Sequence, residues 1–587
     1  MGKSSADNWG DNSFQMFVEL NDNADIKNVS AKIRDIKLKN VNADDAKYKP
    51  AIILHPMNKW HLYSEFKNGV NTGGAIEYVW LFGIIGAFVL LLACINFMNL
   101  STARSEKRAK EVGIRKAVGS LRAQLISQFF CESLLTAVLA CFLSIALVSL
   151  VLPYFNTIAA KPMILPWGNI FFWLACIVFT LFTGIIAGIY PALYLSSFKP
   201  VKVLKGTFKA GRFSAMPRKV LVVVQFAVSV ILIAGTIVVF KQIQYAKNRP
   251  VGYSREGLIN IQVSTLDLHN HFAAVRQELL SAGVITDMTE SSSPMTGLEN
   301  NRGDLDWKEK DPNTTYDFAN IRVSSSYGKT AGWQVLAGRD FNAALKADSE
   351  AVILNEAAVK YMGLKQPLGE IVTFAGRAHT VIGVTKDMVM SSPYEPARQT
   401  IFYLSRDGFD DILIRINPLV STHEAIGKIE AVCKKYSPAV PFSYAFTDNK
   451  YSLKFNSEER IGNLAAIFAS LAIFISCLGL SGMASFMAEQ RTKEIGVRKV
   501  LGASSFNLWR LMSSQFILLV TVALLIAIPV SYTAMNKWLL NYEYRTNISW
   551  WIFVFTAAGA LLITLLAVSY QSIKAATMNP VKSLRTE

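Results

Sequence analysis

The stretch Arg108-Ala-Lys-Glu-Val-Gly-Ile-Arg-Lys-Ala-Val-Gly119 recurs later in the chain as Arg491-Thr-Lys-Glu-Ile-Gly-Val-Arg-Lys-Val-Leu-Gly502. A single offset aligns the two copies without a gap, from Arg108 with Arg491 to Glu132 with Gln515. Each copy lies between two long apolar runs. A basic loop that repeats between repeated apolar segments predicts a chain built from two copies of one unit.

The composition is that of a membrane protein. The 587 residues have a mean hydropathy of +0.29, 51% of them are hydrophobic, and the formal net charge is +17. The positive charge lies in short segments between apolar runs, whereas residues 241–460 hold almost equal numbers of acidic and basic side chains. This distribution is the positive-inside pattern of membrane proteins and argues against nucleic acid as a partner.

Apolar runs long enough to cross a hydrocarbon core of about 30 Å predict the membrane spans. There are seven such runs, covering residues 78–100, 123–152, 170–195, 220–240, 461–487, 511–535 and 550–570. The connections between them are alternately rich and poor in Lys and Arg. We therefore expect the basic connections and the C-terminus in the cytoplasm, and the region 241–460 and the N-terminal segment outside it.

The expected fold is an α-helical polytopic membrane protein with an internal duplication and an α+β extracytoplasmic domain. Its expected parts are a remnant of a first extracytoplasmic domain (1–78), a three-span membrane unit with a basic cytoplasmic loop (79–218), a single span (219–240), the extracytoplasmic α+β domain (241–460) and a second three-span unit (461–587). In the α+β domain, the patterns predict strands at 257–263, 350–354 and 379–384, and helices at 271–281, 355–362 and 421–436.

The two halves of the repeat are unequal in extent. Both three-span units end in a Pro-Val-Lys-x-Leu sequence, at 200–204 and 580–584, but only the second is preceded by a further span and a large domain. Repeat symmetry predicts a shortened form of an eight-span protein, with roughly 140 to 165 residues missing before Met1. A seven-span protein with an exported N-terminus is the competing interpretation.

These features resemble the FtsX-like, MacB-type family of ABC transporter permeases. The resemblance covers nearly the whole chain and is most specific in the repeated loop, at Lys110–Gly119 and Lys493–Gly502. Further matching stretches lie at 61–64, 223–226, 337–341, 352–356 and 381–387. The chain is most similar to the eight-span subgroup with two outer domains, and departs from it by lacking the first span and most of the first outer domain.

The resemblance implies a permease subunit that couples ATP hydrolysis by a separate cytoplasmic ATPase dimer to movement of the extracytoplasmic domains, in export or efflux. It implies the inner (cytoplasmic) membrane of a bacterium, contact with membrane lipid, and a periplasmic adaptor as a further candidate partner. ATP and Mg are then expected on the ATPase, and no cofactor on this chain. The substrate stays open. A membrane-tethered sensor and a secondary transporter, each independent of an ATPase, are the alternatives.

The sequence gives no sign of catalysis by this chain. Gly328-Lys-Thr330 is similar to the end of a P-loop, but position 323 is Val where the motif needs Gly. There is no Gly-x-Ser-x-Gly elbow, and no zinc-protease or cysteine pattern that predicts a metal site. We therefore expect neither an enzyme nor a metal-binding protein.

The candidate contacts with an ATPase lie in the repeated loops. They are Lys110, Glu111, Gly113, Arg115, Lys116 and Gly119 in the first copy, and Lys493, Glu494, Gly496, Arg498, Lys499 and Gly502 in the second. Charges at three- and four-residue spacing predict a charged helix face, and the last glycine predicts a left-handed helix end. Anchoring to anionic lipid is the alternative, but it requires neither the glutamates nor the matched glycines.

Polar and small residues inside the spans form a second candidate group. Glu132 and its repeat partner Gln515 are expected to contact another helix, as are Asn96 and Asn99, because an unpaired polar group in lipid is costly. For Glu132 the alternative is a place near the interface with a snorkelling side chain. The glycines of Gly184-Ile-Ile-Ala-Gly188 either form a close-packing face or are merely tolerated.

Overall fold

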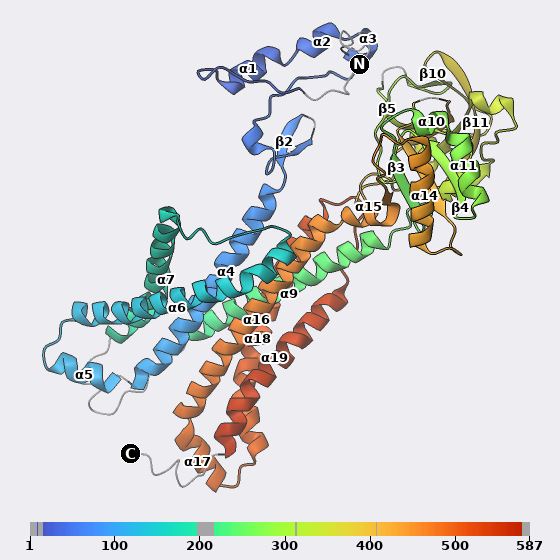
Figure 1. Ribbon diagram of the computed structural model, residues 1–587. Coiled ribbons are helices and arrows are strands. Elements are labelled where there is room, and N and C mark those ends of the chain that lie inside the picture. The colour runs from blue at the N-terminus through green and yellow to red at the C-terminus, as the bar shows by residue number, and fades with distance from the viewer. Residues whose placement is uncertain are drawn as a thin grey trace. The chain divides into compact units, whose positions relative to one another are not determined.

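The computed structural model describes Trp9 and residues 16–67, 69–107, 109–196, 216–311, 314–406 and 408–577 (Figure 1). These residues fall into two compact units. The sheet unit comprises the described parts of Met1–Glu77 and Tyr245–Asn456, with Tyr542–Tyr544. The helical unit comprises the described parts of Tyr78–Gln244, Ser457–Asn541 and Arg545–Glu587. The two Pro-Val-Lys-x-Leu sequences lie outside the described residues.

The described residues include seven helices long and apolar enough to cross a membrane, which confirms the predicted number. They are α4 (Ile76–Lys107), α6 (Arg122–Ala159), α7 (Ile170–Ser196), α9 (Met216–Lys247), α16 (Asn456–Gln490), α18 (Ser505–Leu539) and α19 (Trp550–Thr577). Several run beyond the predicted ends: α6 continues through Pro153, and α9 continues seven residues past Phe240 to Lys247. Hydropathy detects only the apolar part of a helix, and a proline removes one backbone donor without forcing a stop.

The duplication is visible in the bounds of the helices. Under the offset of the repeat, the last residues of α4 and α16 coincide, and α6 and α18 begin at equivalent residues. The short helices between them, α5 (Ala109–Ala117) and α17 (Thr492–Val500), coincide at both ends. The two copies therefore fold alike over the stretch in which their sequences repeat.

The two copies meet at α4 and α16. The side-chain amide of Asn96 donates a hydrogen bond to the carbonyl of Ile475, and the same side chain fills the space where Gly479 would carry a Cβ. Asn96 and Gly479 are equivalent in the repeat, and a two-fold arrangement places equivalent residues together near its axis. The polar contact expected of Asn96 is thus confirmed, whereas Asn99 is buried with no described hydrogen-bond partner for its side-chain carbonyl.

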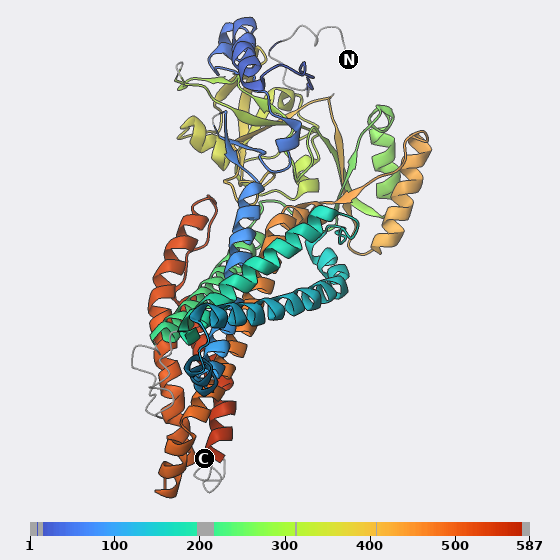
Figure 2. The ribbon, with the colours of Figure 1, turned by 90° about the vertical axis from the view of Figure 1, so that its left-hand side faces the viewer.

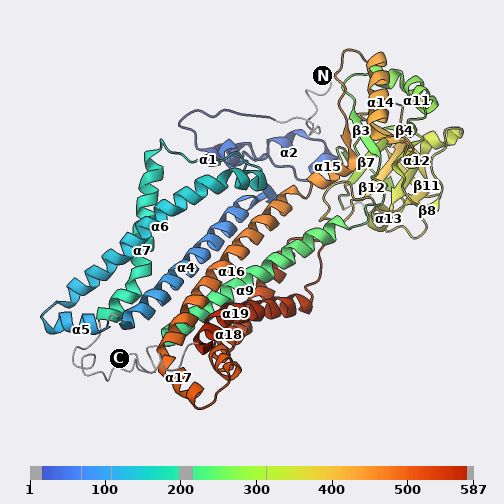
Figure 3. The ribbon, with the colours of Figure 1, turned by 60° about the horizontal axis from the view of Figure 1, so that its bottom comes forward.

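Small residues also set the packing of α7 on α6 (Figure 3). A Cβ on Gly188 would lie 2.9 Å from the Cβ of Ser133, and one on Gly184 would lie 3.2 Å from the Cα of Leu134. A side chain at either position would push the two helices apart. The close-packing interpretation of these glycines is therefore the correct one.

A buried apolar core joins α9 to α16, α18 and α19. Val230, Ala484, Val520 and Val568 each contribute to it, one from each helix. Beside it, the hydroxyl groups of Ser229 and Ser476 lie 2.9 Å apart and buried. Each hydroxyl is thus satisfied within the helical unit.

The sheet unit is built on a mixed sheet of twelve strands, which confirms the predicted α+β character. The main path runs β14-β3-β13-β4-β7-β12-β9-β11-β10-β6, with β5 paired to β7 and β8 paired to β11. The strands are β3 (Leu258–Gln262), β4 (Ile285–Ser291), β5 (Asn301–Arg302), β6 (Asp306–Trp307), β7 (Phe318–Val323), β8 (Val335–Gly338), β9 (Ala351–Asn355), β10 (Ile371–Phe374), β11 (Arg377–Thr385), β12 (Thr400–Leu404), β13 (Asp411–Ile416) and β14 (Ala445–Phe446). The pairs β7–β12 and β9–β11 are parallel. The strands and helices predicted for this region are all present, within a residue or two of their predicted ends.

Helices cover this sheet. They are α10 (Asp267–Asn270), α11 (Phe272–Ser281), α12 (Tyr327–Ala331), α13 (Glu356–Met362), α14 (Thr422–Tyr436) and α15 (Thr447–Leu453), with a 3-10 turn η2 (Lys346–Glu350). Helices α11 and α14 lie side by side, green and orange in Figure 2, and their apolar faces form one core with β3, β4 and β13. The N-terminal part adds α1 (Ile26–Ile33), α2 (Ile36–Asn40), α3 (Ala43–Ala46), a 3-10 turn η1 (Met57–Lys59) and the antiparallel pair β1 (Glu65–Lys67) and β2 (Val70–Gly73).

A buried carboxyl group makes the stability of the sheet depend on pH. Asp411, at the start of β13, is 3% exposed and accepts a hydrogen bond from the side chain of Asn260 at 2.7 Å. Burial, together with the nearby Glu299 and Asp410, raises the pKa of Asp411 to about 6. Because the folded pKa exceeds the unfolded one, the folded state binds this proton more tightly, and stability falls as pH rises from about 4 to about 6.

We expect Asp411→Asn to stabilise the sheet above pH 6 by about 2 kcal/mol, and to change little below about pH 4. The substitution removes the buried charge and keeps the oxygen that accepts from Asn260. Hydrogen exchange of β3 and β13 in the full chain, compared between variant and parent at about pH 5 and about pH 7.5, measures the effect. A variant no better protected than the parent at the higher pH would contradict this account of Asp411.

Candidate functional site

The repeated loops fold as a pair of matching short helices, α5 and α17, which lie at the same end of the helical unit (Figure 1). Each is followed by a glycine in the left-handed region, Gly119 with φ +106° and Gly502 with φ +88°. Just beyond them, the backbone N–H of Ser120 donates to the carbonyl of Arg115, and that of Ala503 donates to Arg498, both at 2.9 Å. The left-handed ends predicted for these helices are therefore present in both copies.

An apolar residue attaches each loop helix to the span that follows it. Val112 of α5 is 3% exposed and lies in a core with Leu125 of α6, and Ile495 of α17 is 5% exposed and lies with Leu508 of α18. Phe129 and Met512, also equivalent in the repeat, complete the two cores. A helix of nine residues is not stable alone in water, so each loop helix depends on this attachment and is held firmly against its span.

Each loop helix also carries a charged pair. Glu111 and Arg115 form a salt bridge of 2.7 Å in α5, and Glu494 and Arg498 form one of 2.7 Å in α17. All four side chains are about half exposed. An exposed pair four residues apart stabilises a helix by only about 0.2–0.5 kcal/mol, so these pairs contribute little to the fold. What they do is present the same charges on the same face in both copies.

Exposed apolar side chains lie beside these charges, and the sequence interpretation missed them. Val118 is 83% exposed and its equivalent Leu501 is 80% exposed, while Ile114 and its equivalent Val497 are about half exposed. The exposure of apolar side chains thus repeats at equivalent positions of the two copies. The signal in the sequence was an apolar residue directly before the loop glycine in both copies.

One predicted contact residue is turned toward its own chain. The ammonium group of Lys116 donates to the carbonyl of Ser196, at the end of α7, at 2.7 Å. Burial, followed by the neighbouring charge of Arg122, lowers the pKa of Lys116. In the same loop, Arg115 also donates to the side chain of Gln128 at 2.8 Å. Lys116 thus ties α5 to α7 and is not on the exposed face.

The other predicted residues are placed as follows. Gly496 is buried within α17, and Lys499 is half-buried there. The side chains of Lys110 and Lys493, and the burial of Gly113, lie outside what the structure describes. Glu132 is exposed on α6 and Gln515 is half-buried on α18, and their contacts to another helix stay predictions. The structure therefore pairs Glu111 with Arg115 and Glu494 with Arg498, and places Gly119 and Gly502 at the left-handed ends of the two helices.

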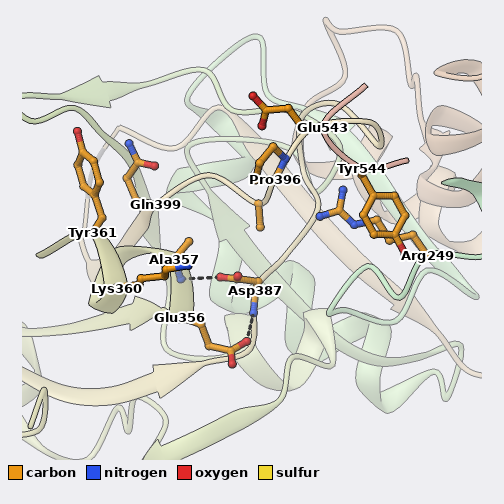
Figure 4. Close-up of a pocket in the computed structure, with 11 residues that line it drawn as sticks. Arg249, Glu356, Ala357, Lys360, Tyr361, Asp387, Pro396, Gln399, Glu543 and Tyr544 are labelled. Atoms are coloured by element: carbon orange, nitrogen blue, oxygen red, sulfur yellow. Dashed lines mark hydrogen bonds between the residues drawn. The ribbon is translucent and has the colours of Figure 1, made fainter. Parts of the chain in front are cut away.

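The sheet unit has an open pocket of about 790 Å³ that the sequence did not indicate (Figure 4). Its lining comes from distant parts of the chain: Arg249, Glu356, Ala357, Lys360, Tyr361, Asp387, Pro396, Ala397, Gln399, Glu543 and Tyr544. The carboxylate of Asp387 accepts from the backbone N–H of Ala357 at 2.8 Å, and the N–H of Asp387 donates to Glu356 at 3.1 Å. Burial raises the pKa of Asp387. Both carboxylates are thus engaged in fixing the start of α13.

Two family models match the chain. The FtsX-like permease C-terminal model matches residues 83–200 and again 466–580, once on each copy of the repeat. The MacB-like periplasmic core domain model matches residues 221–432. Together the two models account for most of the chain, including both loop helices and most of the strands of the sheet unit.

Curated proteins named as ABC transporter permeases or as MacB match the chain at low sequence identity. The uncharacterized ABC transporter permease YknZ of Bacillus subtilis (strain 168) is 23% identical over 286 residues, which are 45% of this chain and 69% of YknZ. The macrolide export ATP-binding/permease protein MacB of Bdellovibrio bacteriovorus is 27% identical over 356 residues, which are 57% of this chain and 51% of MacB. MacB of Neisseria meningitidis serogroup A is 24% identical over 313 residues, 50% of this chain and 46% of that protein. The chain thus spans about half the length of the MacB relatives it matches.

Among solved structures, the periplasmic region of MacB from Actinobacillus actinomycetemcomitans matches with 15% identity and a TM-score of 0.26, covering 34% of this chain and 94% of that one. The match of residues 221–432 to the MacB-like periplasmic core domain model agrees with an extracytoplasmic domain on a protein with several membrane-spanning helices. The relatives are named as components of transporters. From the repeated FtsX-like segments and the MacB-like domain between them, the chain belongs to the FtsX-like, MacB-type family of ABC transporter permeases.

Proposed function

We propose that this chain is the membrane subunit of an export complex, in which a separate cytoplasmic ATPase moves the extracytoplasmic domain by pushing on α5 and α17. The observation that carries the proposal is the matched construction of these two helices. Each is held to the next span by a buried apolar residue and has equivalent charged and apolar side chains that are about half exposed or more. A short helix fixed in this way can pass a displacement directly to its span.

The pairing of the loop helices suits a dimeric partner. Two equivalent surfaces in one chain offer one docking site to each subunit of an ATPase dimer. In this proposal ATP and Mg²⁺ are bound by the ATPase, and this chain binds no cofactor and catalyses no reaction. The names of the MacB relatives join an ATP-binding part to a permease part in one protein, which supports such a partnership here.

The proposed orientation follows from the charge of the loops. The basic loops, α5, α17 and the C-terminus face the cytoplasm, and the MacB-like domain faces the outside of a bacterial inner membrane. Export or efflux is the proposed role, supported by the macrolide export proteins among the relatives. A periplasmic adaptor is a further proposed partner.

Photocrosslinking from the loop helices tests the proposal. A benzophenone amino acid replaces Val118 or Leu501 in the full chain, in native membranes, and Leu419 of the sheet unit serves as an exposed control. We expect both loop positions, and not Leu419, to give adducts with a cytoplasmic ATPase. Adducts with lipid alone would contradict the proposal and favour membrane anchoring. Full function in cells that lack every such ATPase would favour a sensor or a secondary transporter.

A further inference from the structure

One short segment of the sheet unit is contacted by three extensions of membrane helices. We call residues 387–396, between β11 and β12, the joint segment. β11 and β12 both pair with β9 in the middle of the sheet, so a shift of the joint segment acts on central strands. The extensions are the end of α9 from Tyr245, the residues that lead into α16, and Tyr542–Tyr544 of the connection from α18 to α19, all within the sheet unit.

The extension of α9 contacts the joint segment through Arg249 and the residues that follow it. The guanidinium group of Arg249 donates to the carbonyls of Pro393 at 3.1 Å and Glu395 at 2.5 Å. Two residues further on, the carbonyl of Val251 accepts from the N–H of Val389 at 2.9 Å. The segment after α9 thus contacts the joint segment near both ends of the joint segment.

The residues that lead into α16 hold the middle of the joint segment. The ammonium group of Lys454 donates to the carbonyls of Met390, at 2.7 Å, and Ser391. The buried ring of Phe455 lies against the ring of Tyr394 with centroids 5.8 Å apart. Backbone carbonyls that accept from a charged donor are held in place more firmly than those that accept from a neutral one.

The connection between α18 and α19 contacts the joint segment at Tyr394. The N–H of Tyr544 donates to the carbonyl of Tyr394 at 2.9 Å, and the ring of Tyr542 lies 5.1 Å from the Tyr394 ring. The ring of Tyr544 stacks on that of Tyr245 of α9, with ring centroids 4.7 Å apart. The guanidinium group of Arg249 lies over the Tyr544 ring, 4.3 Å from its centroid (Figure 4). Arg249 therefore contacts the joint segment and the α18–α19 connection at once.

We propose that the joint segment receives the motion of α9, α16, α18 and α19, and that the contact between Arg249 and Tyr544 holds the helix extensions to this segment. We call this contact the clasp. This inference rests on the proposed function, because it assigns the residues that pass the motion from the spans to the sheet. Three helix extensions that converge on ten residues move those residues together, whereas separate attachments would spread the motion over the domain. Arg249 and Tyr544 are positioning residues in this account.

Hydrogen exchange of the full chain with its co-purified ATPase in nanodiscs tests the clasp. Exchange is compared between the nucleotide-free state and the state trapped with ATP and vanadate, in α5 and α17 and in residues 388–404. The variants are Arg249→Ala and Tyr544→Ala, which both keep the backbone hydrogen bonds, with Tyr544→Phe as the conservative variant that keeps the ring and loses only the hydroxyl. Tyr444→Ala, an exposed tyrosine of the same unit that lies outside the joint, is the matched control.

In the parent chain we expect trapping to change exchange both in the loop helices and in residues 388–404. In Arg249→Ala and Tyr544→Ala we expect the change in residues 388–404 to fall by roughly tenfold, while the change in α5 and α17 persists. Tyr544→Phe and Tyr444→Ala should keep both changes. An undiminished change in residues 388–404 in both alanine variants would overturn the clasp alone. No change in α5 and α17 of the parent chain would overturn the proposed function and the clasp with it.

Discussion

We expect the replacement of Val118 and Leu501 together by aspartate to lower recovery of the ATPase with the chain by at least about tenfold, because a contact that buries an unpaired charge is strongly weakened. Both side chains are at least 80% exposed, so the fold itself should tolerate the change. The two substitutions act on equivalent positions of α5 and α17 and so remove both docking surfaces at once. Affinity purification of the full chain from membranes, with the ATPase quantified against the chain, measures the effect.

Leu419→Asp is the matched control, since it places the same charge on an exposed leucine of the sheet unit. It should leave recovery of the ATPase unchanged. If the double variant recovers as much ATPase as the control, the loop helices do not dock it. Weaker binding of anionic lipid by the purified double variant, with ATPase recovery intact, would instead identify Val118 and Leu501 as lipid contacts.

Gly479→Ala should loosen the contact between the two halves of the helical unit. The added Cβ would lie 1.8 Å from the side-chain oxygen of Asn96, which must then move and give up its hydrogen bond to Ile475. Overpacking and a lost interhelical hydrogen bond together cost about 2 kcal/mol. We expect the midpoint of thermal unfolding in nanodiscs to fall by roughly 5 °C.

Two further variants separate this effect from a general intolerance of alanine. Gly86→Ala, on α4, adds a Cβ with no other atom within 4 Å and should leave the midpoint unchanged. Asn96→Ala combined with Gly479→Ala removes the clash and should recover part of the loss. A double variant that unfolds earlier than Gly479→Ala alone would refute a direct contact as the cause.

The repeat and the hydropathy predicted most of the fold, because both are patterns of residues that are close together in the sequence. The spans, the strands β3, β9 and β11 and the left-handed ends at Gly119 and Gly502 each depend on neighbouring residues. Helix ends were predicted less well: α16 begins at Asn456, several residues before its apolar stretch. Backbone hydrogen bonds continue where apolar side chains stop, and hydropathy reports only the latter.

The sites were predictable to the extent that their residues are close in sequence. The pairs of Glu111 with Arg115 and Glu494 with Arg498 follow from helical spacing. The turning of Lys116 to Ser196 could not be foreseen, because it depends on where α7 ends. The contact of Arg249 with Tyr544 joins segments separated by most of the MacB-like domain and two spans, and no local pattern indicates it.

The joining of the two copies lies between these cases. Aligning the repeat places a polar residue, Asn96, opposite a glycine, Gly479, at equivalent positions of two spans. A side chain that packs against a glycine allows a close contact near a two-fold axis, so the alignment of the two copies could have predicted this contact. The packing of α4 on α16 was needed to show that these two residues meet.

The most direct test of the account is the rate of ATP hydrolysis by the complex in nanodiscs, compared among the parent chain, Val118→Asp, Leu501→Asp and the double variant. If ATP hydrolysis is coupled to the chain through two equivalent loop helices, each single variant should lower the stimulated rate and the double variant should reduce it to that of the ATPase alone. A double variant that sustains the parent rate, with the ATPase still bound, would contradict coupling through α5 and α17.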